Sequence, residues 1–137
     1  MIQAIDHIGI AVADINEGKQ LYSKIFGVAE FHEEVVEHYG VHVASFLLNG
    51  VRIELTAPMR DDSPIAKFIE RRGEGIHHMA FRSSDIHADL HHIEQQNIQT
   101  INKEPRDGAH DMLIAFLDPR STGGVLMELC SPKPNKL

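Results

Sequence analysis

Two histidines and two glutamates recur at matching positions in the two halves of this sequence. The run Ile-Asp-His-Ile-Gly around His7 returns as Ile-His-His-Met-Ala around His78, and Gly-Val-Arg-Ile-Glu-Leu around Glu54 returns as Gly-Val-Leu-Met-Glu-Leu around Glu128. Imidazole nitrogens and carboxylate oxygens are ligands of divalent transition ions. The repeat therefore predicts two His–Glu pairs, facing each other across a pseudo-twofold axis, that bind one divalent ion such as Zn, Co, Mn, Ni or Fe(II).

The alternation of side chains along a strand decides whether these four residues can face one site. His7 and His78 lie in extended runs in which small residues share their face and large apolar residues occupy the other. Glu54 and Glu128 likewise alternate with apolar neighbours, so each should point away from the layer on which the helices pack. Two carboxylates on an inner sheet face are costly to bury without a cation, which favours a metal site over a duplicated core.

The elements that must position these residues repeat in the order βαβββ. In the first half we expect a strand at 5–13, a helix from the N-cap Asp14 to Gly27, and strands at 30–37, 41–48 and 51–57 with an Asn49-Gly50 turn. In the second half we expect a strand at 76–82, a helix capped by Asp85, strands near 98–103, 112–117 and 125–131, and a turn at 120–124.

A short helix, capped by Ser63 and ending near Gly73, is expected to join the halves. The predicted fold class is α+β, with two βαβββ modules in tandem forming a half-open, curved mixed sheet around a central metal trough. We expect a single domain over residues 1–137, made of modules at about 3–58 and 74–132 with a linker at about 59–73. The tail from Ser131 to Leu137 is expected to be loose.

Composition excludes several classes of function. The chain has 137 residues, and 13 Lys and Arg against 20 Asp and Glu give a net charge of -7, which argues against nucleic acid as the main partner. No apolar run approaches the roughly 20 residues that span a bilayer, and the first residues lack the features of a signal peptide. A cytoplasmic location without a membrane partner is therefore expected. The single cysteine, Cys130, is predicted to be an inert buried thiol.

The remaining eight histidines lack a matching repeat partner of this kind, and none is expected to bind the metal. They are His32, His38, His42, His77, His87, His91, His92 and His110.

The sequence resembles the vicinal-oxygen-chelate superfamily and, within it, the methylmalonyl-CoA epimerase family. The likeness covers nearly the whole chain, and its most specific parts are the runs Asp-Ser-Pro-Ile-Ala at 62–66, Gly-Ile-His-His-Met-Ala at 75–80 and Asp-Gly-Ala-His at 107–110. It implies an acyl-CoA substrate, one divalent metal ion and a homodimer. The implied ligands are His7, His78 and Glu128, with Glu54 in the fourth position, where some relatives use Gln.

The resemblance also implies a reaction. Removing the α-proton of methylmalonyl-CoA would give an enolate stabilised by the metal, and reprotonation on the other face would give the other epimer. Glu128 is the first candidate for the base, because isomerases of this superfamily use a ligand carboxylate that loosens, and Glu54 is the candidate for the other face. Some relatives place a separate Glu on the strand before that of Glu54, at a position occupied here by Val43.

Other functions on the same scaffold remain open. Glyoxalase I, which acts on a glutathione hemithioacetal, would use the same ligands and an enediolate. A non-catalytic drug-binding protein of the bleomycin-resistance type would bind flat aromatic ligands by stacking, whereas this chain has no Trp and 6% aromatic residues. A metal-dependent dioxygenase is a weaker alternative, since it normally uses two His and one carboxylate.

Overall fold

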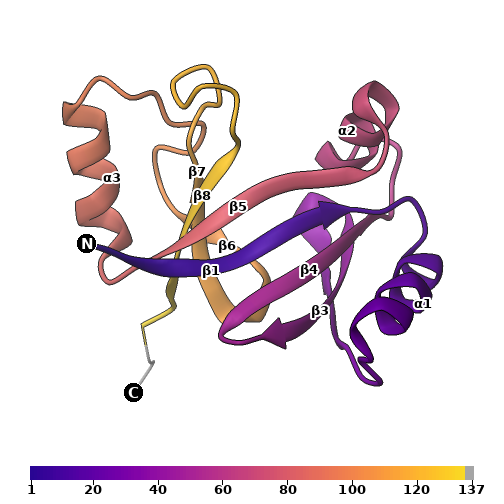
Figure 1. Ribbon diagram of the computed structural model, residues 1–137. Coiled ribbons are helices and arrows are strands. Elements are labelled where there is room, and N and C mark those ends of the chain that lie inside the picture. Colours follow the sequence, from indigo (N-terminus) through magenta and orange to yellow (C-terminus); the bar gives the residue numbers. More distant parts are fainter. Residues whose placement is uncertain (135–137) are drawn as a thin grey trace. The chain divides into compact units, whose positions relative to one another are not determined.

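The computed structural model describes residues 1–134, and its elements follow the predicted order (Figure 1). The strands are β1 (Ile2–Ala11), β2 (His32–Val36), β3 (Val41–Leu48), β4 (Val51–Pro58), β5 (Gly75–Ser83), β6 (Arg106–Asp107), β7 (Met112–Phe116) and β8 (Met127–Pro132). The helices are α1 (Ile15–Phe26), α2 (Pro64–Arg72) and α3 (Ile86–Gln95). The α+β class and the repeated βαβββ order are confirmed. The chain divides into two compact units, residues 7–77 and residues 1–6 with 78 onward.

In the unit of residues 7–77, the strands are hydrogen-bonded in the order β2-β3-β4-β1. Strands β1 and β4 are parallel, and the other neighbours are antiparallel. Helix α1 packs on β3 and β4 (Figure 1), where Val12, Leu55 and Ala57 form a core that Ile15 and Tyr22 of the helix cover. This core occupies the face that carries the odd-numbered residues of β4.

Local signals in the sequence explain the ends of these elements. The Asp14 side chain accepts a hydrogen bond from the Glu17 amide at 2.9 Å, and Gly27 ends α1 with φ 69°. Asn49 and Gly50, with φ of 47° and 85°, form the tight turn that joins β3 to β4. The Ser63 hydroxyl caps α2 by accepting from the Ala66 amide at 3.1 Å. These three predictions are confirmed.

The other unit contains the first residues of β1. Its further strands are hydrogen-bonded in the order β5-β8-β7-β6. Strands β5 and β8 are parallel, whereas β7 is antiparallel to both β8 and β6. Helix α3 places Ile86, Leu90 and Ile93 against Ala115 and Leu129 to form the core. As in residues 7–77, the helix covers one face of the sheet only.

The strand predicted at 98–103 is wrong. Only an isolated bridge between Thr100 and Leu117 forms there, and the short strand β6 follows at Arg106–Asp107. The Phe116 amide donates to the Asn102 side-chain oxygen at 2.9 Å, so a side chain occupies the position that a backbone carbonyl would take in a regular ladder. The Ile101 amide donates to the Phe116 carbonyl, which makes the backbone pairing here irregular.

The end of the chain also differs in part from the expectation. Ser131 and Pro132 belong to β8 and are therefore not part of a loose tail. Residues 135–137 of that predicted tail lie outside the described residues.

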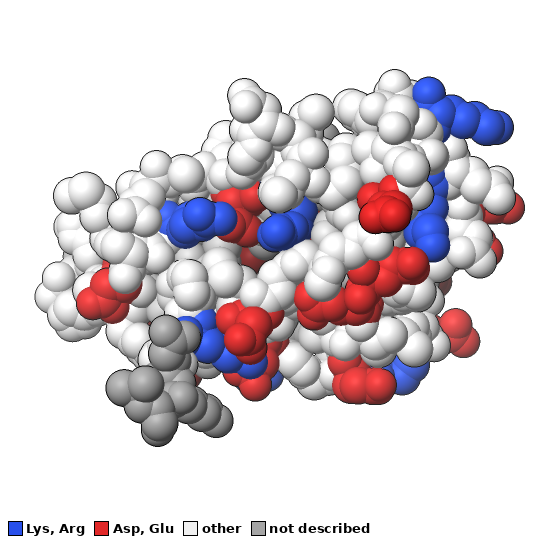
Figure 2. Space-filling view, turned by 90° about the horizontal axis from the view of Figure 1, so that it is seen from below, with Lys and Arg blue, Asp and Glu red and all other residues white. Residues whose placement is uncertain are grey.

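Charged side chains of both signs lie on the surface. On the face drawn in Figure 2, acidic and basic side chains are interspersed. Within residues 1–134, none of the helices has the length and apolar character needed to cross a bilayer.

Candidate metal centre

His7 and Glu54 meet on one face of the sheet in the unit of residues 7–77. Gly9 is the parallel-strand partner of Glu54, and such partners point to the same face, as does His7 two residues earlier. His7 Nδ1 lies 3.6 Å from Glu54 Oε2, and the two side chains are 8% and 6% exposed. Leu55 points to the opposite face, into the core beneath α1. The face predicted for this pair is thus confirmed.

His78 and Glu128 form the corresponding pair in the other unit. Ala80 is the parallel-strand partner of Glu128, and His78 again precedes this small residue by two positions. His78 Nε2 lies 3.5 Å from Glu128 Oε1, and the side chains are 9% and 4% exposed. The ring of Phe116 packs edge-on against His78, with ring centroids 5.6 Å apart.

The two pairs fit a divalent ion by their chemistry and spacing. Nitrogen–oxygen distances of 3.5 and 3.6 Å exceed a normal hydrogen bond. They approach the roughly 3.4 Å that separates two ligand atoms held at about 2.1 Å from a tetrahedral ion. A cation would also offset the cost of burying the carboxylates. These buried His–Glu groups could therefore hold a metal, while their convergence on a single ion stays a prediction.

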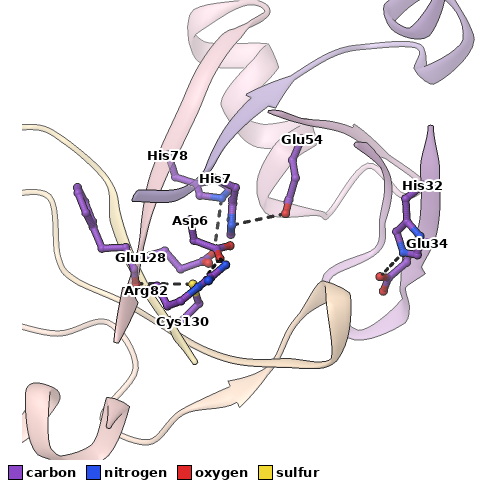
Figure 3. Close-up of polar contacts among 10 residues, drawn as sticks. Asp6, His7, His32, Glu34, Glu54, His78, Arg82, Glu128 and Cys130 are labelled. Atoms are coloured by element: carbon purple, nitrogen blue, oxygen red, sulfur yellow. Dashed lines mark hydrogen bonds and ion pairs between the residues drawn. The ribbon is translucent and has the colours of Figure 1, made fainter. Parts of the chain in front are cut away.

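A partly buried ion pair beside the second His–Glu pair was not predicted from the sequence. Arg82 donates from Nε and Nη2 to Asp6 Oδ1, at 3.0 and 2.6 Å, and the Asp6 side chain is buried (Figure 3). The two residues are 76 positions apart. A pairing at this separation has no local signal in the sequence.

Cys130 lies in the same cluster and is expected to be unreactive. Its thiol is fully buried and contacts the Phe81 carbonyl at 3.6 Å. Burial, and then the nearby Asp6 and Glu128 carboxylates, raise the pKa of the Cys130 thiol far above its usual value. The thiol therefore stays protonated at neutral pH, which makes it a poor nucleophile and metal ligand. This agrees with the predicted inert buried thiol.

His77 precedes the ligand candidate His78 but packs differently. Its ring lies edge-on against Phe68 of α2, with ring centroids 4.9 Å apart. Burial, and then the positive charge of Arg71, lower the pKa of His77 to about 4. The imidazole is therefore neutral at pH 7. Its place is in the packing of α2.

Five of the other histidines fall into two groups. His87, His91 and His92 are exposed on α3, as predicted. Two more pair with glutamates in residues 7–77: His32 Nε2 lies 2.9 Å from Glu34 Oε1, and His42 Nε2 lies 3.0 Å from Glu33 Oε1. These two pairs could not be distinguished from each other by sequence alone.

The strand register places the first of these pairs on the face of the His7–Glu54 pair. His32 is the cross-strand partner of Ser45, which is itself the partner of Glu54. Glu34 is the partner of Val43, the buried position at which the resemblance implies a glutamate in some relatives. This face of residues 7–77 thus carries Glu34 one strand away from Val43.

Comparison with protein families gives a match over most of the chain. The model that matches residues 6–116 is described as Glyoxalase/Bleomycin resistance protein/Dioxygenase superfamily. Among curated proteins, an uncharacterized Bacillus subtilis protein, YqjC, is 43% identical over 94% of this chain and 92% of its own length. The mitochondrial methylmalonyl-CoA epimerase of Dictyostelium discoideum is 37% identical over 93% of this chain and 78% of its own.

Solved structures agree closely with this fold. A methylmalonyl-CoA epimerase in complex with methylmalonyl-CoA and NH4+ matches with a TM-score of 0.92 and 36% identity, over 96% of both chains. A variant of the Streptomyces coelicolor methylmalonyl-CoA epimerase in complex with 2-nitronate-propionyl-CoA matches with a TM-score of 0.93 and 34% identity. It covers 100% of this chain and 99% of that one.

Proposed function

This chain belongs to the glyoxalase/bleomycin resistance protein/dioxygenase superfamily and, within it, to the methylmalonyl-CoA epimerase family, and on that premise we propose that it interconverts (2R)- and (2S)-methylmalonyl-CoA. The chain is accordingly an epimerase. The observation that carries the proposal for the site is the equivalence of two buried His–Glu pairs, each on the sheet face opposite its helix-covered core.

Four residues are proposed to hold one divalent ion: His7, Glu54, His78 and Glu128. Two imidazoles and two carboxylates suit Co, Zn, Mn, Ni or Fe(II). When bound, such an ion supplies Lewis acidity that stabilises negative charge on the thioester oxygen. The protein's own part is to hold the ligand side chains in a buried environment, where the interaction between opposite charges is stronger than in water.

Epimerisation needs one group that removes the α-proton and another that delivers a proton to the opposite face. Glu128 is proposed as the first of these, because one of its oxygens can leave a ligand position and accept the proton. Glu54 occupies the equivalent position in residues 7–77 and is the candidate that symmetry offers for the other face. Both carboxylates are buried.

The substrate partner is proposed to be an acyl-CoA. A cytoplasmic location and a homodimer remain predictions from the sequence and its family.

The proposal is tested by offering the protein each of two substrates separately. Purified protein reconstituted with Co²⁺ is incubated with (2R)-methylmalonyl-CoA in D2O and, separately, with the glutathione hemithioacetal of methylglyoxal. Appearance of the (2S) epimer with α-deuterium, followed by NMR and chiral analysis, is the expected result. Turnover of the hemithioacetal alone would instead identify a glyoxalase I, and turnover of neither would contradict an isomerase of this kind.

A further inference from the structure

The His32–Glu34 pair lies on the site face of residues 7–77. By strand register, Glu54 on β4, Ser45 on β3 and His32 on the edge strand β2 lie in one row on this face. Figure 3 shows Glu54 between His7 on one side and the His32–Glu34 pair on the other. Ser45 is small and buried, so β3 itself contributes no long side chain to the row between Glu54 and His32.

The pair has the construction of an acid–base group. Glu34 Oε1 lies 2.9 Å from His32 Nε2, so the carboxylate orients the ring. The His32 side chain is 60% exposed and that of Glu34 is 27% exposed, so the imidazole can exchange protons with water. On β3, the residues next to the pair on this face are Val43 and Ser45, neither of which is an acid or a base at neutral pH.

Glu54 is poorly placed for the same task. It is buried against His7, with their side-chain atoms 3.6 Å apart, and the proposed function already assigns it to the metal. Glu128 already combines the roles of ligand and base, and a second ligand carboxylate that also loosened would leave the ion held by the two histidines alone. The next titratable group along the row is His32.

We propose that His32, oriented by Glu34, is the catalytic acid–base residue that residues 7–77 contribute to the epimerisation, in place of Glu54. This inference rests on the proposed function. In one direction Glu128 accepts the α-proton and protonated His32 delivers a proton to the other face of the enolate carbon. Glu128 is then protonated and His32 neutral, and exchange with water restores both before the next turnover. In the reverse direction the two residues exchange roles.

The protein contains a matched control for this pair. His42 and Glu33 lie on the same two strands, with His42 Nε2 3.0 Å from Glu33 Oε1, but they face the side that carries the helix-covered core. Glu33 also accepts from Lys19 at 3.0 Å. His42→Gln therefore removes a His–Glu contact of the same kind from the same strands without touching the site face.

The experiment compares inversion with proton exchange for each epimer in D2O. His32→Gln is expected to slow inversion by roughly 10²–10⁴-fold, the usual contribution of a general acid–base group. One epimer should still exchange its α-proton at close to the wild-type rate, because Glu128 can remove and return it on one face. The other epimer should lose exchange by the same factor as inversion. His42→Gln should leave inversion and both exchange rates within about twofold of wild type.

Glu34→Gln gives a second measure that does not alter the ring. It should lower inversion by roughly tenfold or more, since the neutral amide makes a weaker hydrogen bond to the His32 ring than the carboxylate does and orients it less firmly. Co²⁺ binding by both variants should equal that of wild type, because neither residue is a proposed ligand.

Inversion by His32→Gln at the wild-type rate would overturn the assignment and leave the proposed function intact. Loss of exchange for both epimers, with Co²⁺ binding unchanged, would also overturn it, because His32 is proposed to transfer a proton on only one face of the enolate carbon. Failure of the wild-type protein itself to exchange or invert either epimer would overturn the proposed function, and this inference with it.

Discussion

A single oxygen of Asp6 accepts both hydrogen bonds that Arg82 donates to it, from Nη2 at 2.6 Å and from Nε at 3.0 Å. Asp6 immediately precedes the ligand candidate His7, and Arg82 follows His78 on β5. The pair therefore fixes the two strands beside the residues on which the proposed chemistry depends.

Removal of this ion pair should destabilise the protein. Arg82→Gln leaves a buried carboxylate without its charged partner, and we expect a loss of about 1–3 kcal/mol, because the Arg82 side chain is 48% exposed and partly screened. Urea unfolding followed by circular dichroism measures the change. Arg120→Gln, which breaks the pair that the exposed Arg120 forms with Asp118, is the control and should not alter stability measurably. Equal effects of the two substitutions would refute the structural role of the Asp6–Arg82 pair.

Glu128→Gln should abolish exchange of the substrate α-proton with deuterated water. The amide lacks the basicity of the carboxylate, so a loss of at least roughly 10²-fold is expected for the exchange that Glu128 initiates. NMR of methylmalonyl-CoA in D2O with the Co²⁺-loaded variant measures it. Full exchange in this variant would remove Glu128 from the role of base.

His7→Ala and His78→Ala should weaken metal binding to a similar extent, because the two His–Glu pairs are built alike. We expect the Kd for Co²⁺ to rise by roughly tenfold or more in each, measured by competition with a chelating dye. His77→Ala is the neighbouring control and should bind Co²⁺ as wild type does. A change confined to one of the two ligand variants would contradict a shared site.

Metal should also stabilise the folded protein. An ion that binds only the native state raises the free energy of unfolding by about 2.7 kcal/mol at a hundred times its Kd. Thermal unfolding should thus move to lower temperature with a chelator and return when Co²⁺ is added. No shift in wild type, or an equal shift in the His7→Ala variant, would contradict this expectation.

The neutral His77 makes stability depend on pH. Its pKa is about 4 in the folded protein against 6.5 for the free side chain, so the unfolded chain binds more protons between these values. Stability should therefore fall as pH decreases from 6.5 to 4, by up to about 3 kcal/mol from this residue. Urea unfolding of the chelator-treated protein at several pH values tests this. His77→Phe should reduce that slope, and an unchanged slope would rule out His77 as its cause.

The sequence was sufficient for the parts of the site that follow from local rules. Strand alternation and the internal repeat predicted that His7 would share a face with Glu54 and His78 with Glu128. Side chains on a strand alternate with a fixed period, and a duplicated module repeats its pairing. The caps at Asp14 and Ser63 and the Asn49-Gly50 turn were predictable for the same reason, since each depends on a few consecutive residues.

Features that depend on distant partners were not predictable. Asp6 and Arg82 meet only because β1 and β5 are neighbours in the sheet, and His32 could be separated from His42 only by knowing the register of β2 and β3. The strand expected at 98–103 was wrong because the Asn102 side chain, rather than a backbone carbonyl, receives the Phe116 amide. A side chain that accepts a backbone hydrogen bond does not change the alternation of apolar and polar residues. The sequence pattern therefore could not reveal that a regular strand would not form there.

Strand β1 begins in one compact unit and continues in the other, and this has a consequence for synthesis of the chain on the ribosome. Residues 1–6 are made before residues 7–77, yet they belong with residues from 78 onward, where the Ser84 amide donates to the Met1 carbonyl at 3.1 Å. Residues 1–6 must therefore wait until the whole of residues 7–77 has been made before their partners are available. Residues 7–77, which form one compact unit from a continuous stretch of chain, can fold earlier during translation.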